Sequence, residues 1–330
     1  MNHDDFTHLV VLPHLKVHNA NAVSSPLTHG FPSITAFLGL MWALERKTRA
    51  LGLDLAFNAV GVVCHGYEEQ ATEGGFVKSF RLTRNPPLVR TDKKLIDKDG
   101  NFSTPAIVEE GRIHLDLSLV LAVHAETWDQ DAQRRDLQTL TELLQGMRVA
   151  GGTLLPSAPR HRAWIADFTS GDPDDRTHAF HRLRTRLLPG TALVARDDLI
   201  DQRLRELQAG NPGATRLDAW LSLSRINWHY DAAANAGKGG WQNDRKGRGW
   251  IVPIPVGYGA LSELHAAGSV PNARDATTPF RFVESLYSMG EWIGPHRLHS
   301  PLDLLWYADS QPDSGLYRCR NDYRAPATSL

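Results

Sequence analysis

The first half of the sequence predicts an α+β fold in which two helices alternate with strands. Two segments, residues 34–51 and 131–147, carry apolar residues at helical spacing. Residues 113–121 alternate apolar and polar side chains, as a half-buried strand does. Further apolar runs precede, separate and follow these segments. The resulting order, βαββαβ, is the split βαβ arrangement of ferredoxin-like or RRM-like folds.

The elements follow one another closely. Residues 9–17 predict the first strand, and Ser33 stands where its hydroxyl can cap the helix predicted over residues 34–51. That helix ends in cationic side chains, which the negative end of a helix dipole favours. The remaining predicted elements are strands over 55–65, 76–82 and 113–121, a helix over 131–147 that Gly151 and Gly152 stop, and a closing strand over 153–155.

A long basic insertion, residues 84–111, divides this fold into the parts 1–83 and 112–155. An irregular excursion of this length in a compact domain is usually functional. Arg81, Arg84 and Asn85 open it, and Phe102 lies at its far side. Cationic groups beside an aromatic ring suit single-stranded RNA, whose splayed bases stack. The residue types support a solvated charged loop equally well.

The second half, residues 156–330, is less regular, and we expect it to pack on the first. Residues 187–207 predict a strand and then a helix. The Gly/Asn/Lys-rich residues 232–249 predict a mobile loop, and residues 250–258, with two prolines, predict an edge strand or extended segment. Residues 280–292 predict a helix with Phe282, Leu286 and Met289 on its buried face.

Composition limits the function classes. The formal net charge of −1 means that any nucleic-acid surface must concentrate its basic residues on one face. The 2 cysteines form no CxxC motif, which argues against a disulfide framework or a zinc site and fits a reducing cytoplasm. The polar, acidic N-terminus is unlike a signal peptide, and no apolar run is long enough for a membrane span. We therefore expect a cytoplasmic protein without metal, cofactor or membrane segment.

Small polar residues are concentrated in the loop after the first predicted strand. Asn19, Asn21, Ser24 and Ser25 can hydrogen-bond RNA phosphates or base edges. The helix that begins after Ser33 adds amide donors and a positive dipole end. Residue types alone favour a different interpretation, in which these side chains cap and turn the loop internally.

Three arginines alternate near the middle of the chain. Arg182, Arg184 and Arg186 would share one face of an extended segment and could then contact RNA, whereas a helix would spread them apart. The sequence slightly favours a helix surface on which they form ion pairs with Asp174 and Asp175.

The sequence also resembles a known family nearly from end to end. The segments that carry the resemblance are NANAVSSPLTHGFPSITAFLG (19–39), GVVCH (61–65), LTRNP (82–86), AIVEEGRIHLDLSL (106–119), MRVAGGTLLP (147–156), RLLPGTALV (186–194), GWIVPIPVGYGALS (249–262), NARD (272–275), RFVESLYSMGEWIGPHR (281–297), DLLWY (303–307) and GLYR (315–318). In this order they are far more specific than any single short motif. They resemble the second Csy subunit, which grips the crRNA 5′ handle in type I-F CRISPR surveillance complexes.

This resemblance implies a non-catalytic RNA-binding subunit in crRNA-guided antiviral defence. It would hold the 5′ handle of the crRNA with the large Csy subunit, contact the backbone Csy subunit and cap the backbone filament, with target DNA nearby. Residues 84–111 would form a thumb inserted in an RRM-like palm of RAMP type. The candidate RNA-binding residues are Asn19, Asn21, Ser24, Ser25, Arg81, Thr83, Arg84, Asn85, Arg182 and Arg184.

An RRM-like CRISPR endoribonuclease that processes repeat RNA is the alternative. Such enzymes often place a catalytic histidine near the end of the first strand, where His14 and His18 lie. The sequence shows no partner set for either histidine, and it contains neither GxxxxGKS nor HExxH. The resemblance implies that a separate subunit cuts the precursor RNA, so we assign no catalytic residue.

Overall fold

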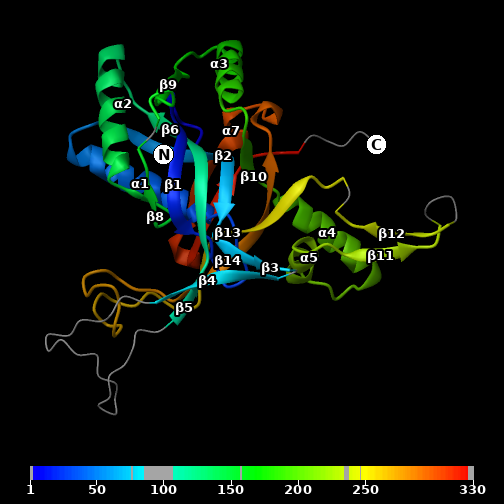
Figure 1. Cartoon of the computed structure of the whole chain (residues 1–330). Coiled ribbons are helices and arrows are strands. Elements are labelled where there is room, and N and C mark those ends of the chain that lie inside the picture. Colours follow the sequence, from blue (N-terminus) through cyan, green and yellow to red (C-terminus); the bar gives the residue numbers. More distant parts are fainter. Residues whose placement is uncertain are drawn as a thin grey trace.

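A large antiparallel sheet runs through the computed structural model, which describes residues 3–75, 77–84, 107–156, 158–233, 238–245 and 247–325 (Figure 1). Its strands are β1 (His8–Asn21), β2 (Ala56–Glu69), β6 (Arg112–His124), β7 (Arg148–Val149), β8 (Gly152–Leu154), β9 (Trp164–Asp167), β10 (Thr191–Ala195), β13 (Trp250–Ala260), β14 (Val283–Ile293), β15 (Leu305–Gln311) and β16 (Leu316–Asn321). The hydrogen-bonded order is β10-β14-β13-β16-β15-β2-β6-β1-β8-β7, with β9 beside β1. The helices described below lie against this sheet, which confirms a mixed α+β fold.

In the first half of the chain, strands lie side by side in the order β2-β6-β1-β8, each antiparallel to its neighbours. Helix α1 (Ile34–Ala50) connects β1 to β2, and α2 (Gln130–Gln145) follows β6. These elements confirm the strands predicted at 9–17, 55–65, 113–121 and 153–155 and both predicted helices. Their ends differ from the predicted bounds by a few residues, as helix and strand ends commonly do.

Helix α1 begins where the sequence predicted. The Ser33 hydroxyl accepts a hydrogen bond from the Thr35 amide at 3.3 Å and donates one to the Pro255 carbonyl at 3.1 Å. The cap therefore also ties the start of α1 to β13. The apolar stripe of α1, including Phe37 and Met41, is buried against the sheet.

The sheet is buried on both faces. Along β6, Leu117, Leu119 and Leu121 face the core that α1 and α2 cover, whereas Val120 and Ala122 face a second core. Phe180 and other residues of α3 (Pro173–Arg186) close that second core. This alternation is what the period of a strand dictates.

The second half adds strands that close a ring. β10 pairs with β14 on one side and with β2 on the other, so the path β2-β15-β16-β13-β14-β10 returns to its start. Leu193, Ile254 and Trp306 from this ring join the same core as α1. The Trp306 indole donates a hydrogen bond to the Leu193 carbonyl at 2.8 Å.

The helix predicted at 280–292 is wrong, because most of this segment is strand β14. β14 lies between β10 and β13 and is hydrogen-bonded to both. Consecutive residues from Ser288 to Glu291 are buried, since the strand is covered on both faces. Such a strand shows no alternation of apolar and polar residues, and the spacing of Phe282, Leu286 and Met289 then matches a helix by chance.

Other parts of the second half agree better with the sequence. Strand β10 and helix α4 (Asp197–Gly210) confirm the strand and helix predicted at 187–207. Pro253 and Pro255 lie in the half of β13 that pairs with β14 alone, which is the predicted edge character. The segment predicted as a loop at 232–249 contains β12 (Gly240–Asn243), which pairs with β11 (Trp228–Asp231).

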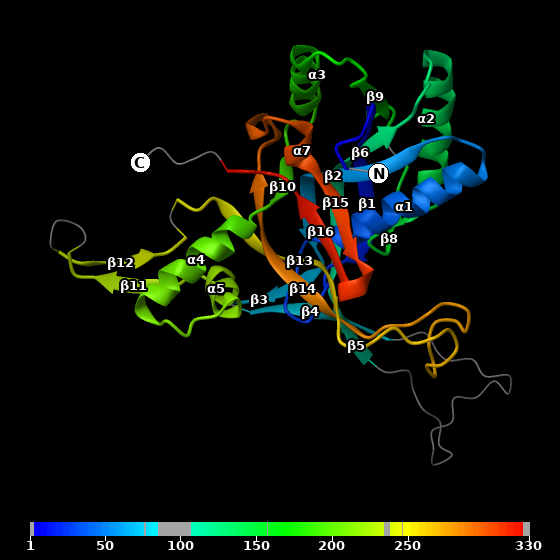
Figure 2. The ribbon, with the colours of Figure 1, turned by 180° about the vertical axis from the view of Figure 1, so that it is seen from behind.

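A small separate sheet contains β3 (Ala71–Gly74), β4 (Val77–Arg84) and β5 (Ile107–Glu110). The strand predicted at 76–82 is therefore present, but it pairs outside the large sheet. Both views place β4 and β5 at the end of the molecule opposite α3 (Figures 1 and 2). Residues 85–106, with Asn85 and Phe102, lie outside the described residues.

The shorter helical elements are α5 (Arg216–Leu223), η1 (Pro295–Arg297), α7 (Pro301–Leu304) and η2 (Pro312–Ser314). α4 and α5 pack on β14 through a third apolar cluster that includes Ile200, Trp220 and Met289. Within the described ranges, no helix is both long and apolar enough to span a membrane.

Candidate nucleic-acid interface

The loop after β1 is held largely by its own hydrogen bonds. The Asn21 side-chain amide donates to the Val23 carbonyl at 2.9 Å, and the Val23 backbone amide donates back to Asn21 Oδ1 at 3.1 Å. The Ser24 hydroxyl accepts the Ser33 backbone amide at 2.9 Å. These contacts are those of a capping and turn loop, and they fix the path of the chain into α1.

Asn19 differs from Asn21 and Ser24 because its side chain forms no hydrogen bond with another described residue. Its backbone has a positive φ of 56°, a conformation that asparagine tolerates better than most residues. Its amide donates to His114 Nδ1 at 3.1 Å, and its carbonyl accepts from Arg112 Nη1 at 3.5 Å. The exposed Asn19 side chain has no hydrogen-bond partner among the described residues, so its donors and acceptor are available to a ligand.

Asn19 lies in a cavity of about 410 Å³ between β1, β4, β6 and β7, which we call the basic groove. Its lining residues are His18, Asn19, Gln70, Arg81, Thr83, Glu110, Arg112, Arg148, Gly151 and Thr153. The groove thus brings together residues from five parts of the chain, at 18–19, 70, 81–83, 110–112 and 148–153.

Positive charge dominates the basic groove. Arg81, Arg112 and Arg148 contribute guanidinium groups, and Glu110 contributes the carboxylate. The hydrogen bond from Arg112 lowers the pKa of Glu110, and a further hydrogen bond from Thr83 acts in the same direction. Arg81 is exposed and forms no ion pair with another described residue. Guanidinium groups of this kind bind phosphate oxygens through charge-assisted hydrogen bonds.

A second cavity, of about 650 Å³, adjoins the basic groove, and we call it the α1 groove. Arg148 and Gly151 line both cavities. The α1 groove also contains Asn21, Thr35 at the start of α1 and Lys47 near the end of that helix. The two grooves form one surface along which an extended polyanion can lie.

The predicted site residues therefore fall into separate groups. Asn19, Arg81 and Thr83 meet in the basic groove, whereas Asn21 and Ser24 line the α1 groove. Ser25 is buried and shares a 2.6 Å hydrogen bond with Thr28. The backbone of Arg84 pairs with Ile107 in β5, and Asn85 is not described.

Arg182 and Arg184 do not join these grooves. They lie on α3, at the end of the molecule opposite β4 (Figures 1 and 2). Arg184 donates a hydrogen bond to the Leu298 carbonyl, and Arg186 lies over the Trp164 ring at 3.7 Å. The helix spreads the three arginines, as predicted. The expected ion pairs with Asp174 and Asp175 do not form within the described residues.

Sequence reasoning did not select Lys47, Arg112 or Arg148 as site residues. Arg112 begins β6, and Arg148 stands just before the Gly151-Gly152 turn that leads into β8. Both lie inside family-like segments, 106–119 and 147–156. Their place beside Asn19 depends on strand pairing, since Arg112 faces Asn21 across β1 and β6.

Histidines gather on the exposed part of the same sheet. The His14 ring stacks on His65, with ring centroids 4.0 Å apart, and His161 lies on its other side at the same distance. His14 Nδ1 donates to Asp116 at 3.1 Å, and Lys16 donates to the same carboxylate at 2.5 Å. Lys16 and Asp116 form a partner set for His14 that the sequence alone did not reveal.

The tautomer of His65 follows from its partners. Its Nδ1 lies 2.7 Å from the Pro189 carbonyl, which can only accept, so Nδ1 carries the proton. Nε2, 2.6 Å from the Ser118 hydroxyl, then accepts. Burial is the largest cause that lowers the pKa of His65, and the electrostatic effects of His14 and Lys16 lower it further. The hydrogen bond to the Pro189 carbonyl and the negative charge of Asp116 act in the opposite direction and raise this pKa.

We predict a loss of stability in mild acid that depends on His65. The unfolded histidine takes up a proton near pH 6.5, whereas the folded one resists protonation because its pKa is lowered. The unfolded state then binds more protons, so the free energy of unfolding falls as pH drops below about 6.5, by at most about 1.4 kcal/mol per pH unit. Urea unfolding between pH 7.5 and 5.5 should show a shallower decline for His65→Gln. His8, whose pKa burial also lowers, is unchanged in the variant. An identical decline in both proteins would refute this assignment.

Comparisons with known proteins match nearly the whole chain. A family model described as CRISPR-associated protein (Cas_Csy2) matches residues 10–319. The CRISPR-associated protein Csy2 of Pseudomonas aeruginosa (strain UCBPP-PA14) is 45% identical over 320 residues, which cover 94% of this chain and 94% of that relative. These matches confirm the resemblance to the second Csy subunit of type I-F CRISPR complexes. The chain belongs to the Csy2 family of CRISPR-associated proteins.

Proposed function

We propose that the protein is a non-catalytic, cytoplasmic RNA-binding subunit that holds the crRNA 5′ handle in a type I-F CRISPR complex. The observation that carries this proposal is the basic groove. Asn19 and Thr83, from segments that resemble the second Csy subunit, meet there with Arg81, Arg112 and Arg148. Guanidinium groups, with Arg81 unpaired among the described residues, beside the Asn19 amide suit both the phosphates and the base edges of a single strand.

The strand arrangement supports an RRM-like palm. The order β8-β1-β6-β2 is that of the ferredoxin-like sheet when β1, β2, β6 and β8 are taken as its strands. In this proposal residues 1–83 and 112–155 form the palm, residues 84–111 form the thumb, and residues 156–330 pack on the palm. The strand ring through β10 and β15 and the pairing of β9 with β1 support this division.

The proposed partners are the large Csy subunit, with which the chain would form a heterodimer, and the backbone Csy subunit, with target DNA nearby. Exposed aromatic residues support a partner surface. Trp228, Tyr230 and Trp241 on the β11–β12 hairpin are 58%, 58% and 66% exposed. Rings in such numbers on one hairpin are unusual on a surface that faces only water.

Copurification tests the proposal directly. The chain, coexpressed with the large subunit and a CRISPR repeat transcript, should retain RNA whose sequenced 5′ ends share the handle. Binding of that RNA by the purified heterodimer should weaken steeply with salt, as phosphate contacts require. RNA of random sequence, or binding that salt does not change, would overturn the proposal.

The endoribonuclease alternative now has one observation in its favour. His14 is oriented by Asp116 and lies beside Lys16, and a histidine with a cationic neighbour can act on a ribose hydroxyl. Incubation of the purified protein with repeat RNA separates the two functions. Retention without cleavage supports the scaffold, whereas cleavage that His14→Ala abolishes supports the enzyme.

We predict opposite effects for two neighbouring asparagines. Asn19→Gly removes an unpaired side chain and keeps the positive φ accessible, so it should cost roughly 1–3 kcal/mol of handle affinity with little change in melting temperature. Asn21→Ala breaks the two hydrogen bonds with Val23 and should mainly lower the melting temperature. Handle affinity and melting temperature should be measured on both variants. A stable Asn19→Gly protein with unchanged affinity would remove Asn19 from the site.

A further inference from the structure

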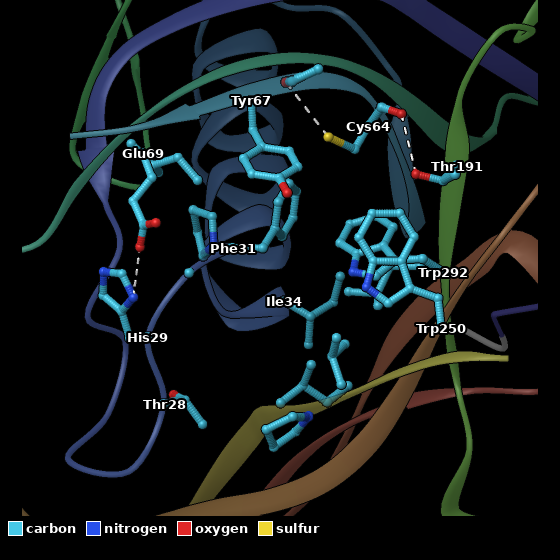
Figure 3. A pocket seen from close by; sticks show the side chains of 18 of the residues that line it. Thr28, His29, Phe31, Ile34, Cys64, Tyr67, Glu69, Thr191, Trp250 and Trp292 are labelled. Atoms are coloured by element: carbon cyan, nitrogen blue, oxygen red, sulfur yellow. Dashed lines mark hydrogen bonds and ion pairs between the residues drawn. The ribbon is translucent and has the colours of Figure 1, made fainter. Parts of the chain in front are cut away.

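A pocket of about 570 Å³ that the proposed function does not use lies at one mouth of the strand ring (Figure 3). β2, β10, β13 and β14 of the ring contribute to its wall, and the loop at residues 28–32 closes its remaining side. Its volume falls in the range of pockets that bind small ligands, and barrel mouths are frequent ligand sites.

Aromatic rings form much of the wall of this pocket. Figure 3 shows Trp250 beside Trp292 on one side, with Tyr67 and Phe31 on the other. Trp250 and Tyr67 are 53% and 61% exposed, so their ring faces are open to a ligand. Rings on two sides of a cavity suit a flat ligand that can stack.

Polar groups of these rings are also available to a ligand. The indole nitrogens of Trp250 and Trp292 and the Tyr67 hydroxyl make no hydrogen bond to any described residue. In contrast, the indoles of Trp220 and Trp306 donate to backbone carbonyls at 3.0 and 2.8 Å. Buried indoles such as these two take a protein partner, whereas the exposed Trp250 and Tyr67 donors are accessible to a ligand whose edge carries acceptors.

Hydrogen-bonding and charged groups also lie at one side of the pocket. His29 Nδ1 lies 3.0 Å from Glu69, and Lys78 approaches the same carboxylate at 3.4 Å. An aliphatic side chain placed here would leave these polar groups facing an apolar surface, which is unfavourable. A nucleobase presents donors and acceptors on its edge and an apolar face, and therefore matches both parts of the lining.

The pocket lies next to the proposed RNA surface. The loop between β1 and α1 separates them, with Asn21 and Ser24 on the α1 groove and His29 and Phe31 in the pocket. Pro32 lines both cavities. A strand in the α1 groove therefore runs beside the loop that forms one wall of the pocket.

We propose that this pocket binds one unstacked nucleobase of the RNA that the basic groove and α1 groove hold, with Trp250 and Tyr67 as stacking partners. The inference rests on the proposed function, because it assigns a further contact to the same RNA. Trp250 and Tyr67 would stack on the two faces of the base, and the Trp292 indole N–H would meet its edge.

A scan of abasic positions tests this pocket. The RNA that copurifies with the coexpressed heterodimer is synthesised with one nucleotide at a time replaced by an abasic residue. One position should weaken wild-type binding by roughly 5- to 100-fold, the range for loss of a stacked base. Trp250→Ala should weaken binding of intact RNA by a similar factor and show no further loss at that position.

Phe282→Ala is a matched control, because Phe282 is 50% exposed and lies outside the pocket. It should retain wild-type affinity and the wild-type abasic profile. Tyr67→Phe keeps the stacking ring and should therefore retain near-wild-type affinity.

The outcomes separate the pocket from the proposed function. Two results would refute the base pocket and leave the RNA-binding function standing, provided that handle RNA binds with strong salt dependence. In one, Trp250→Ala does not weaken binding. In the other, the affinity losses from Trp250→Ala and from the abasic position multiply when the two changes are combined. If the wild-type heterodimer binds no handle RNA, both fail. A loss with Trp250→Ala that is equal at every abasic position would place its effect outside base recognition and would also refute the pocket.

Discussion

Simultaneous replacement of Arg81, Arg112 and Arg148 by alanine is expected to weaken handle binding at low salt by about a hundredfold or more. Each removes a guanidinium from the basic groove, and three contacts at roughly 1 kcal/mol each give this factor. The slope of log affinity against log salt should fall by about two units, since a single-strand phosphate contact contributes about 0.7. Filter binding of the heterodimer across a salt series measures both quantities.

Melting temperature should change little in this variant. Arg81 is exposed and unpaired among the described residues, and the Arg112–Glu110 pair lies at the surface, where ion pairs contribute weakly. Replacement of Arg134, Arg135 and Arg205, which are exposed on α2 and α4, removes the same charge elsewhere. This control should reduce affinity only slightly. Equal losses in the two triple variants would assign the effect to net charge and would contradict a localised groove.

Arg182 provides an internal test of the same assignment. It was a candidate from the sequence, but it lies on α3, away from both grooves. If α3 faced the RNA, Arg182→Ala would weaken binding as much as Arg81→Ala does. The geometry favours the opposite order.

The sequence was informative where local pattern decides structure. Helix α1 carries its apolar residues at helical spacing, and Ser33 caps it at the predicted position. Strand β6 alternates cleanly because one face meets α1 and α2 while part of the other is polar, with His114 and Asp116. In both elements the neighbouring residues report the environment of each side chain.

The sequence pattern predicted the wrong structure where segments distant in the sequence determine the burial of a strand. β14 is buried on both faces by elements that the sequence places far away, so its residues show no strand period. Likewise, the sequence of β4 predicts a strand, but it does not reveal that this strand pairs with β5 in a separate small sheet. Alternation reports burial and cannot report which strand lies alongside.

The candidate site shows the same limit. Residue type and resemblance selected Asn19, Arg81 and Thr83, which the fold brings together. Arg112 and Arg148 were not selected, since only strand pairing places them beside Asn19. Conversely, Asn21 and Ser24 had the right chemistry for RNA, yet hydrogen bonds inside the loop use part of it.

The second large effect is expected from the buried ion pair that fixes β14. Glu291 is 4% exposed, and Arg196, at the start of α4, donates a hydrogen bond to its carboxylate. Asp198 accepts two further hydrogen bonds from the same guanidinium, each at 2.9 Å. Glu291 stands next to Trp292, which lines the proposed base pocket, so we expect the pair to help position that wall.

Arg196→Ala should lower the free energy of unfolding by about 3–5 kcal/mol, because it leaves the Glu291 carboxylate buried without its cation. Urea unfolding of the variant and of wild type measures this loss. The double variant Arg196→Met with Glu291→Leu removes both charges and fills similar volume, so it should recover most of the stability. If the double variant is instead destabilised by the sum of the two single losses, the two side chains act independently. A coupled pair would explain why β14, whose sequence reads as a helix, is held as a strand: the carboxylate reaches its guanidinium partner only when β14 lies along β10.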